Sequence, residues 1–194
     1  MIISHRSGVS TKIVFLLEEK SAQLLLESLL PRILPETDFK CVPHKGYNAL
    51  QASIPQKLRY WKDVRFVILH DQDNKDCEKL KSDLSQICEE NNRADTVVCI
   101  ACQELEAWYW GDLDAVARVY PKFNPERVRN KAPFRKPDKI VKPSKALKKT
   151  LPEFEKVTAA EEIGQYMDWE NNKSPSFQYF VATVKKLAET ETHS

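Results

Sequence analysis

The sequence predicts an α/β fold: a parallel sheet of about four strands flanked by helices, with a helical C-terminal extension. The first observation is that short apolar runs alternate with amphipathic segments over the first two thirds of the chain. The second is that three of the four apolar runs end directly in carboxylates. Because open α/β sheets bind ligands at the carboxyl edge of their strands, this pattern indicates a site at that edge.

The clearest strand is predicted at residues 64–70, where VRFVILH is followed by DQDNKD. Five of these seven residues are apolar, and three are β-branched, which is typical of a strand buried on both faces. Asp71 and Asp73 follow the strand two residues apart. At ~4 Å two carboxylates repel by roughly 4 kcal/mol at an effective dielectric near 20, so such a pair is protonated, splayed apart or bridged by a cation. A hard, oxygen-binding ion of the Mg²⁺ type is the bridge we expect.

The remaining strands are predicted at residues 12–17, 39–42 and 96–102, and acidic residues follow the first and the last of them. Parallel strands present their carboxyl ends at one edge of the sheet, so these acids are expected to form one cluster. The candidate metal ligands are Glu18, Glu19, Asp71, Asp73, Glu104 and Glu106. The structural alternative is that they serve as first-turn acids of helices or as turn-capping residues.

Helices are predicted between the strands from their apolar periodicity. Ser21 is the expected N-cap of the first helix. A second helix is expected from residue 48 or 49 to residue 61, interrupted at Pro55, and a third over residues 76–90. Asp112 is expected to cap a short helix that follows the last strand.

A basic segment follows this α/β core. Residues 127–149 contain ten basic residues and one acid, so this segment carries +9 in a chain whose net charge is +2. We expect residues 1–122 to form the core, and residues 123–194 to form a basic loop and helices packed on it as one unit. A basic segment on an acidic body is typical of a protein that binds a polyanion, and the alternative is a solvated, proline-broken loop. The candidate nucleic-acid contacts are His44, Lys45, Arg129, Lys131, Arg135, Lys136, Lys142 and Lys145.

Composition limits the functional class further. No apolar run approaches the ~20 residues of a membrane span, and the first dozen residues lack the apolar stretch of a signal peptide. Five cysteines, an odd number scattered through the predicted strands and helices, favour reduced thiols, so a cytoplasmic protein is expected. With four glycines and no GxxxxGK or GxGxxG pattern, nucleotide hydrolysis by a P-loop is excluded.

Six ordered blocks of sequence resemble a known family. The blocks are LLEEKSA, IPQKLRYW, DQDNKDC, IACQELEAWYWGDL, KPDKI with PSKALKK, and NKSPSFQYF. Over residues 13–182 they resemble the TOPRIM-like Domain of Unknown Function 4276 family. The first and third blocks are similar to the glutamate and D-x-D of the TOPRIM fold, which type IA topoisomerases, bacterial primases and overcoming-lysogenization-defect nucleases share. The chain departs from this family at Tyr47, where many relatives read Lys-x-Asp-Leu and this chain reads YNAL.

The resemblance implies that the catalytic residues are Glu18, Asp71, Asp73 and Glu106, which would hold one or two Mg²⁺ or Mn²⁺ ions. We therefore expect a metal-dependent nuclease or a related phosphodiester-acting enzyme, whose partner is nucleic acid, DNA rather than RNA. The resemblance further implies an ATPase partner of the ABC or SMC type and a role in defence against foreign DNA. The sequence leaves the oligomeric state open.

Two other functions compete with this prediction. One is a nucleic-acid-binding or regulatory module whose TOPRIM site binds metal without cleavage, which the departure at Tyr47 favours. The other is a phosphatase or nucleotide-sugar transferase, because these enzymes also carry a strand that ends in D-x-D. Here DQD is followed by Asn74 and Lys75 rather than by the threonine or valine expected of a phosphatase, which counts against that function.

Overall fold

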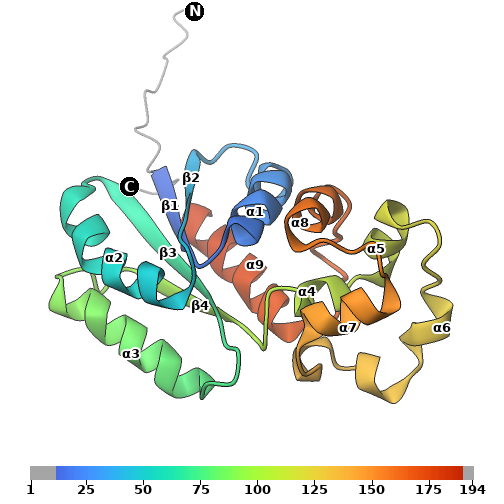
Figure 1. Ribbon diagram of the computed structural model, residues 1–194. Helices are drawn as coiled ribbons and strands as arrows, with labels where there is room; N and C mark the ends of the chain where they lie inside the picture. The colour runs from blue at the N-terminus through green and yellow to red at the C-terminus, as the bar shows by residue number, and fades with distance from the viewer. Residues whose placement is uncertain (1–11, 190–194) are drawn as a thin grey trace, which may run out of the picture.

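A four-stranded parallel sheet lies at the centre of the computed structural model, which describes residues 12–189 (Figure 1). The strands are β1 (Lys12–Leu17), β2 (Phe39–Pro43), β3 (Val64–Asp71) and β4 (Val97–Ala101), in the order β2-β1-β3-β4. Leu17 of β1 pairs with Pro43 on one side and Leu69 on the other, and Asp71 pairs with Ala101. The predicted α/β fold with a parallel sheet of four strands is confirmed.

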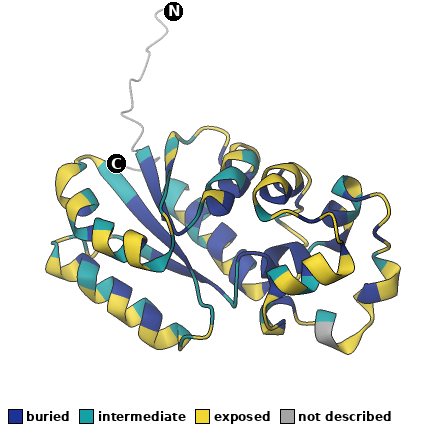
Figure 2. Ribbon diagram, in the orientation of Figure 1, coloured by how far each residue is buried: buried dark blue, intermediate teal, exposed yellow. Residues whose placement is uncertain are grey.

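Helices cover both faces of the sheet. They are α1 (Lys20–Ile33), α2 (Tyr47–Tyr60), α3 (Cys77–Glu90), α4 (Ala107–Trp110), α5 (Leu113–Val119), α6 (Glu126–Arg129), α7 (Pro143–Thr150), α8 (Lys156–Gly164) and α9 (Pro175–Glu189), with 3₁₀ turns η1 (Ala132–Phe134) and η2 (Pro137–Lys139). Successive side chains of a strand point to opposite faces, so β1 contributes to two apolar clusters. Val14 and Leu16 pack with α2 and α3, whereas Phe15 and Leu17 pack with α1 and α9. Most residues of β1, β3 and β4 are accordingly buried, whereas edge strand β2 is mostly half-buried (Figure 2).

The larger apolar cluster joins the sheet to the C-terminal helices. The ring of Phe180 in α9 lies 6.2 Å from that of Phe15 in β1 and 5.2 Å from that of Trp108 in α4. Trp108, Tyr109 and Trp110 are at most 2% exposed, so all three side chains belong to the core. Short helix α4, which follows β4, is thereby held against the same face of the sheet as α9.

Two helices differ from the prediction. Glu19 rather than Ser21 occupies the N-cap of α1, and no side chain caps this end; Ser21 is buried instead. Pro55 does not interrupt the second helix but lies inside α2. A proline removes one helical hydrogen bond, and burial of the apolar face of α2, through Leu50, Ile54 and Leu58, offsets that loss.

Residues 1–11, where no signal peptide is expected, and residues 190–194 lie outside the described part of the chain. Within residues 12–189 no helix is long and apolar enough to span a membrane. All five cysteines are free thiols. The boundary expected at residue 122 stays a prediction.

Candidate functional site

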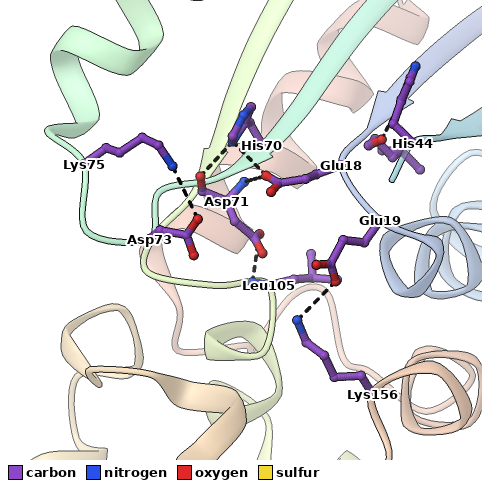
Figure 3. Close-up of polar contacts among 10 residues, drawn as sticks. Glu18, Glu19, His44, His70, Asp71, Asp73, Lys75, Leu105 and Lys156 are labelled. Atoms are coloured by element: carbon purple, nitrogen blue, oxygen red, sulfur yellow. Dashed lines mark hydrogen bonds and ion pairs between the residues drawn. The ribbon is translucent and has the colours of Figure 1, made fainter. Parts of the chain in front are cut away.

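The carboxyl edge of the sheet places Glu18 against the end of β3 (Figure 3). Glu18 follows β1 directly, and the parallel pairing of Leu17 with Leu69 brings it level with His70 and Asp71. Its Oε2 accepts a hydrogen bond from the backbone N–H of Asp71 at 3.3 Å and lies 3.0 Å from Nδ1 of His70. Acids from the first and third strands therefore come together at this edge.

His70 keeps Glu18 in its ionised form. Burial raises the pKa of Glu18, but the hydrogen bond and charge of His70, the N–H of Asp71 and the charge of Lys75 outweigh burial, and the pKa ends below its ordinary value. His70 is fully buried, and its Nδ1 lies 2.7 Å from the carbonyl oxygen of Asp71 as well as near Glu18. Because both neighbours are acceptors, Nδ1 carries the proton. Nε2 has no hydrogen-bond partner within residues 12–189.

Burial disfavours the ionised forms of two acids of this edge, Asp71 and Glu106. Oδ1 of Asp71 accepts a hydrogen bond from the N–H of Leu105 at 3.0 Å. Burial raises the pKa of Asp71 well above its ordinary value, and the carboxylates of Glu106 and Glu18 raise it further. Glu106 is 0% exposed, and neither of its carboxylate oxygens has a hydrogen-bond partner among the described residues. Burial raises the pKa of Glu106 to about 7, against the opposing charge of Lys156.

Lys156, the first residue of α8, supplies positive charge to Glu19 and Glu106. Its Nζ lies 3.2 Å from Oε2 of Glu19 and 3.3 Å from Oε1 of Glu106. Burial lowers the pKa of Lys156, but the charges of Glu106, Glu19 and Asp71 outweigh burial and raise it. Lys156 is not among the site residues predicted from the sequence. The EFEKVTAA segment around Lys156 has no distinguishing pattern, and the lysine reaches the site only because α8 packs against α1.

The packing of α8 on α1 depends on a glycine. A Cβ atom at Gly164 would lie 2.9 Å from Cβ of Ser28 and 3.0 Å from the carbonyl oxygen of Leu25, both in α1. Arg32 of α1 also donates hydrogen bonds to the carbonyl oxygens of Gly164 and Met167, at the end of α8. These contacts hold the two helices together, so Lys156 lies beside Glu19.

Asp73 and Glu104 lie at the outer part of the edge. The side chain of Asp73 is 44% exposed, and its Oδ2 lies 3.4 Å from Nζ of Lys75. The backbone of Asp73 is left-handed, with φ 52°. Oε2 of Glu104 accepts a hydrogen bond from the backbone N–H of Ser144 at 2.9 Å, near the start of α7. Both acids line a cavity of about 440 Å³, together with Lys142 and Lys145 of the basic segment; we call it the acid-edge cavity. Two predicted nucleic-acid contacts are thus beside two predicted metal ligands.

Other predicted nucleic-acid contacts are occupied within the protein. Both ring nitrogens of His44 have partners, a carbonyl oxygen of β1 at 2.8 Å and Oγ of Ser53 at 2.6 Å. Arg129 pairs with Asp114 and Glu126, and Arg135 donates to the carbonyl oxygen of Asn130. The other predicted contacts are exposed lysines whose ammonium groups have no partner within residues 12–189: Lys45, Lys131, Lys136, Lys142 and Lys145.

The start of α9 positions α4, and Glu106 is the N-cap residue of α4. Nε1 of Trp108 donates to Oγ of Ser176 at 3.0 Å, and Nδ2 of Asn172 donates to the carbonyl oxygen of Trp108 at 2.9 Å. Asp138 in turn accepts a hydrogen bond from the N–H of Ser176 at 2.7 Å. The ELEAW, KPDKI and NKSPSFQYF blocks of the sequence therefore meet in one hydrogen-bonded network that fixes the position of Glu106.

The donor chemistry of this edge suits a hard divalent cation, because carboxylate oxygens are the ligands that Mg²⁺ and Mn²⁺ prefer. Oε1 of Glu106 has only the ion pair with Lys156, Oε2 has no hydrogen-bond or ion-pair partner among the described residues, and the pKa of Asp71 is raised; these observations indicate that the edge has too little positive charge. However, within the described residues no group of three His, Cys, Asp or Glu side chains is arranged closely enough to hold a metal ion as it stands. Metal binding stays a prediction.

The fold and this edge define a Rossmann-like α/β protein with a cluster of acids and two lysines, Lys75 and Lys156, at the carboxyl ends of its parallel strands. The chain belongs to the family described as Domain of unknown function (DUF4276), which matches residues 17–185. The resemblance drawn from the six sequence blocks is thus confirmed.

A solved structure, that of the C-terminal region of the OLD protein of Xanthomonas campestris pv. campestris, is similar to this chain with a TM-score of 0.54 and 10% sequence identity. The similarity covers 96% of this chain and 99% of that one, and at this identity it concerns the fold. Among curated proteins none matches the chain.

Proposed function

We propose that this protein is a metal-dependent nuclease or a related enzyme that acts on phosphodiesters. The observation that carries the proposal is the convergence of Glu18, Asp71 and Glu106 on one edge of the sheet. Lys75 and Lys156 are the lysines that act on these acids. The similarity of the fold to that of the C-terminal region of an OLD protein supports the proposal.

Each acid has a distinct part in this proposal. A bound Mg²⁺ or Mn²⁺ would supply Lewis acidity and an activated water. Glu18 is ready to bind a cation, because His70 already keeps it ionised. Asp71 and Glu106 must first lose protons that their surroundings favour, so the affinity for metal should increase with pH. Asp73, beside the acid-edge cavity, would complete the ligand set.

The basic segment indicates that the substrate is a nucleic acid. Lys142 and Lys145 line the same cavity as Asp73 and Glu104, where they would bind the phosphates on either side of the cleaved one. We propose DNA rather than RNA as the substrate. From the family resemblance we also propose an ATPase partner of the ABC or SMC type, cytoplasmic location and a role in defence against foreign DNA.

Cleavage of plasmid and oligonucleotide DNA by the purified full-length protein tests this function, with Mn²⁺, Mg²⁺ or EDTA present. Asp71→Asn should reduce cleavage by a factor of about 100 or more, since a ligand of the reacting centre is lost. Asp83→Asn, which removes an exposed acid of α3, is the matched control and should cleave as the wild type does. Absence of cleavage by wild type in saturating Mn²⁺, despite binding of the ion, would refute the proposal.

A second function is favoured by one observation. Lys156 already occupies the space between Glu19 and Glu106, so part of the negative charge is balanced by the protein itself. This arrangement fits a nucleic-acid-binding or regulatory module that does not cleave. Binding of DNA that is equally strong in Mn²⁺ and EDTA, without cleavage in either, would support this second function over the first.

A further inference from the structure

A second cavity, of about 700 Å³, has an apolar floor and a basic rim. Its apolar lining includes the partly buried Phe134 and the buried Ile140, and Val141, 68% exposed, lies at its mouth. Four exposed lysines surround it: Lys131, Lys136, Lys139 and Lys149. No Asp or Glu is among its described lining residues, so the charge of the rim is uncompensated there. We call it the lysine-rimmed cavity.

An aromatic stack reaches into this cavity from the core. The rings of Trp110 and Phe134 are stacked, with centroids 4.4 Å apart and an interplanar angle of 16°. Trp110 is 2% exposed and covers one face of the Phe134 ring. The part of Phe134 that lines the cavity is therefore its other face or its edge, on which a further planar ring could stack.

Helix α7 borders both this cavity and the acid-edge cavity. Lys142 and Lys145 line the acid-edge cavity, while Ala146 and Lys149 line the lysine-rimmed cavity. From Lys142 to Lys149 the helix rises about 10 Å, close to the length of three nucleotides of a helical strand. One face of α7 thus presents lysines at helical spacing from one cavity to the other.

We propose that the lysine-rimmed cavity receives an unpaired base of a nucleic-acid strand, whose backbone passes along α7 to the acid-edge cavity. The inference rests on the proposed function and narrows its substrate to strands that contain unpaired nucleotides. Charge complementarity favours this occupant, because four lysines match a phosphate backbone. The aromatic floor adds stacking of Phe134 on the base. Any of the four bases can stack in this way when it is unpaired, whereas a base inside a duplex is already stacked between its neighbours.

Binding of labelled oligonucleotides in EDTA tests the inference without cleavage or metal. The probes are a 12-nucleotide single strand, the same backbone with abasic residues at all internal positions, and the blunt duplex. Stacking of one base accounts for a factor of about 10 in affinity, so the wild type should bind the intact strand about tenfold more tightly than the abasic strand. The duplex should bind more weakly than the intact strand as well.

Three variants distinguish the contribution of the aromatic floor to binding from that of the lysine rim. Phe134→Leu should bind intact and abasic strands alike, since the ring is lost and the apolar volume largely kept. Lys149→Glu should weaken binding of both strands, whereas Lys62→Glu, the same charge change at an exposed site outside both cavities, should leave both unchanged. If thermal unfolding shows that Phe134→Leu does not fold, Val141→Glu places a negative charge at the cavity instead. This exposed side chain packs little, and the variant should bind both strands more weakly than wild type.

The outcomes distinguish this inference from the proposed function. Equal affinity of the wild type for intact and abasic strands overturns the inference, even if the protein cleaves DNA. Preference for the intact strand without any cleavage in Mn²⁺ supports the inference and refutes the nuclease. Competition by a glutamate- and leucine-rich peptide as strong as that by the oligonucleotide would assign the cavity to an acidic protein segment and overturn the inference as well.

Discussion

The buried carboxyl group of Glu106 should make the stability of the protein depend on pH. Its pKa is about 7 in the folded state, against an ordinary value of 4.5. Because one pKa unit corresponds to about 1.4 kcal/mol, the difference is worth about 3 kcal/mol of unfolding free energy. The side chain is 0% exposed, so solvent screening does not reduce this value much.

The direction of this pH dependence follows from which state, folded or unfolded, binds the proton of Glu106 more tightly. Below pH 4.5 Glu106 is protonated in both states and stability is unaffected. Between pH 4.5 and about 7 the unfolded chain releases the proton first, so the contribution of Glu106 to stability is lost as the pH rises. Glu106→Gln stays neutral, and we therefore expect it to gain stability relative to wild type between pH 5 and pH 8, by about 3 kcal/mol.

Urea unfolding in EDTA at pH 5 and pH 8, followed by tryptophan fluorescence, measures this difference. Glu161→Gln, which changes an exposed acid of α8, is the matched control and should show the same pH dependence as wild type. If Glu106→Gln and wild type change stability in parallel from pH 5 to pH 8, the assignment of a buried, protonated Glu106 is wrong.

Three further changes probe the surroundings of the site. Lys156→Met removes the charge between two acids, so Mn²⁺ should stabilise this variant against heat at lower concentrations than wild type; a higher requirement would contradict the view that lysine and metal compete. Gly111→Ala should cost about 2 kcal/mol or more in urea unfolding, because its Cβ would lie 2.0 Å from Oδ1 of the buried Asn172; wild-type stability would be inconsistent with this packing. Ser176→Ala should cost about 1–3 kcal/mol, as it leaves the buried indole N–H of Trp108 without its acceptor, and a cost near zero would show that another acceptor replaces it.

Local sequence patterns predicted the strands and the acids that follow them. The β-branched run before Asp71 and the apolar run before Glu18 each identify a buried strand, and parallel topology alone brings their ends to one edge. Glu106, a predicted ligand, is buried together with its apolar neighbours Leu105 and Trp108.

Long-range packing and loop geometry could not be predicted in this way. Lys156 lies 137 residues from Glu19 along the chain, and their contact depends on the close approach of two helices at Gly164. Asp73 and Glu104 point to the outer cavity, since the first has a left-handed backbone and the second binds the start of α7. These orientations depend on single backbone angles and hydrogen bonds, which leave no periodic signal in the sequence.

Through the network at its start, α9 helps to position Glu106, which lies 70 residues before Ser176 in the chain. A protein shortened before Asn172 would retain every carboxylate of the edge, yet it would lack the amide and hydroxyl groups that fix Trp108. Such a truncation should loosen Glu106 without removing a single one of the acids. The geometry of the acidic edge therefore depends on residues of α9 that carry no carboxylate themselves.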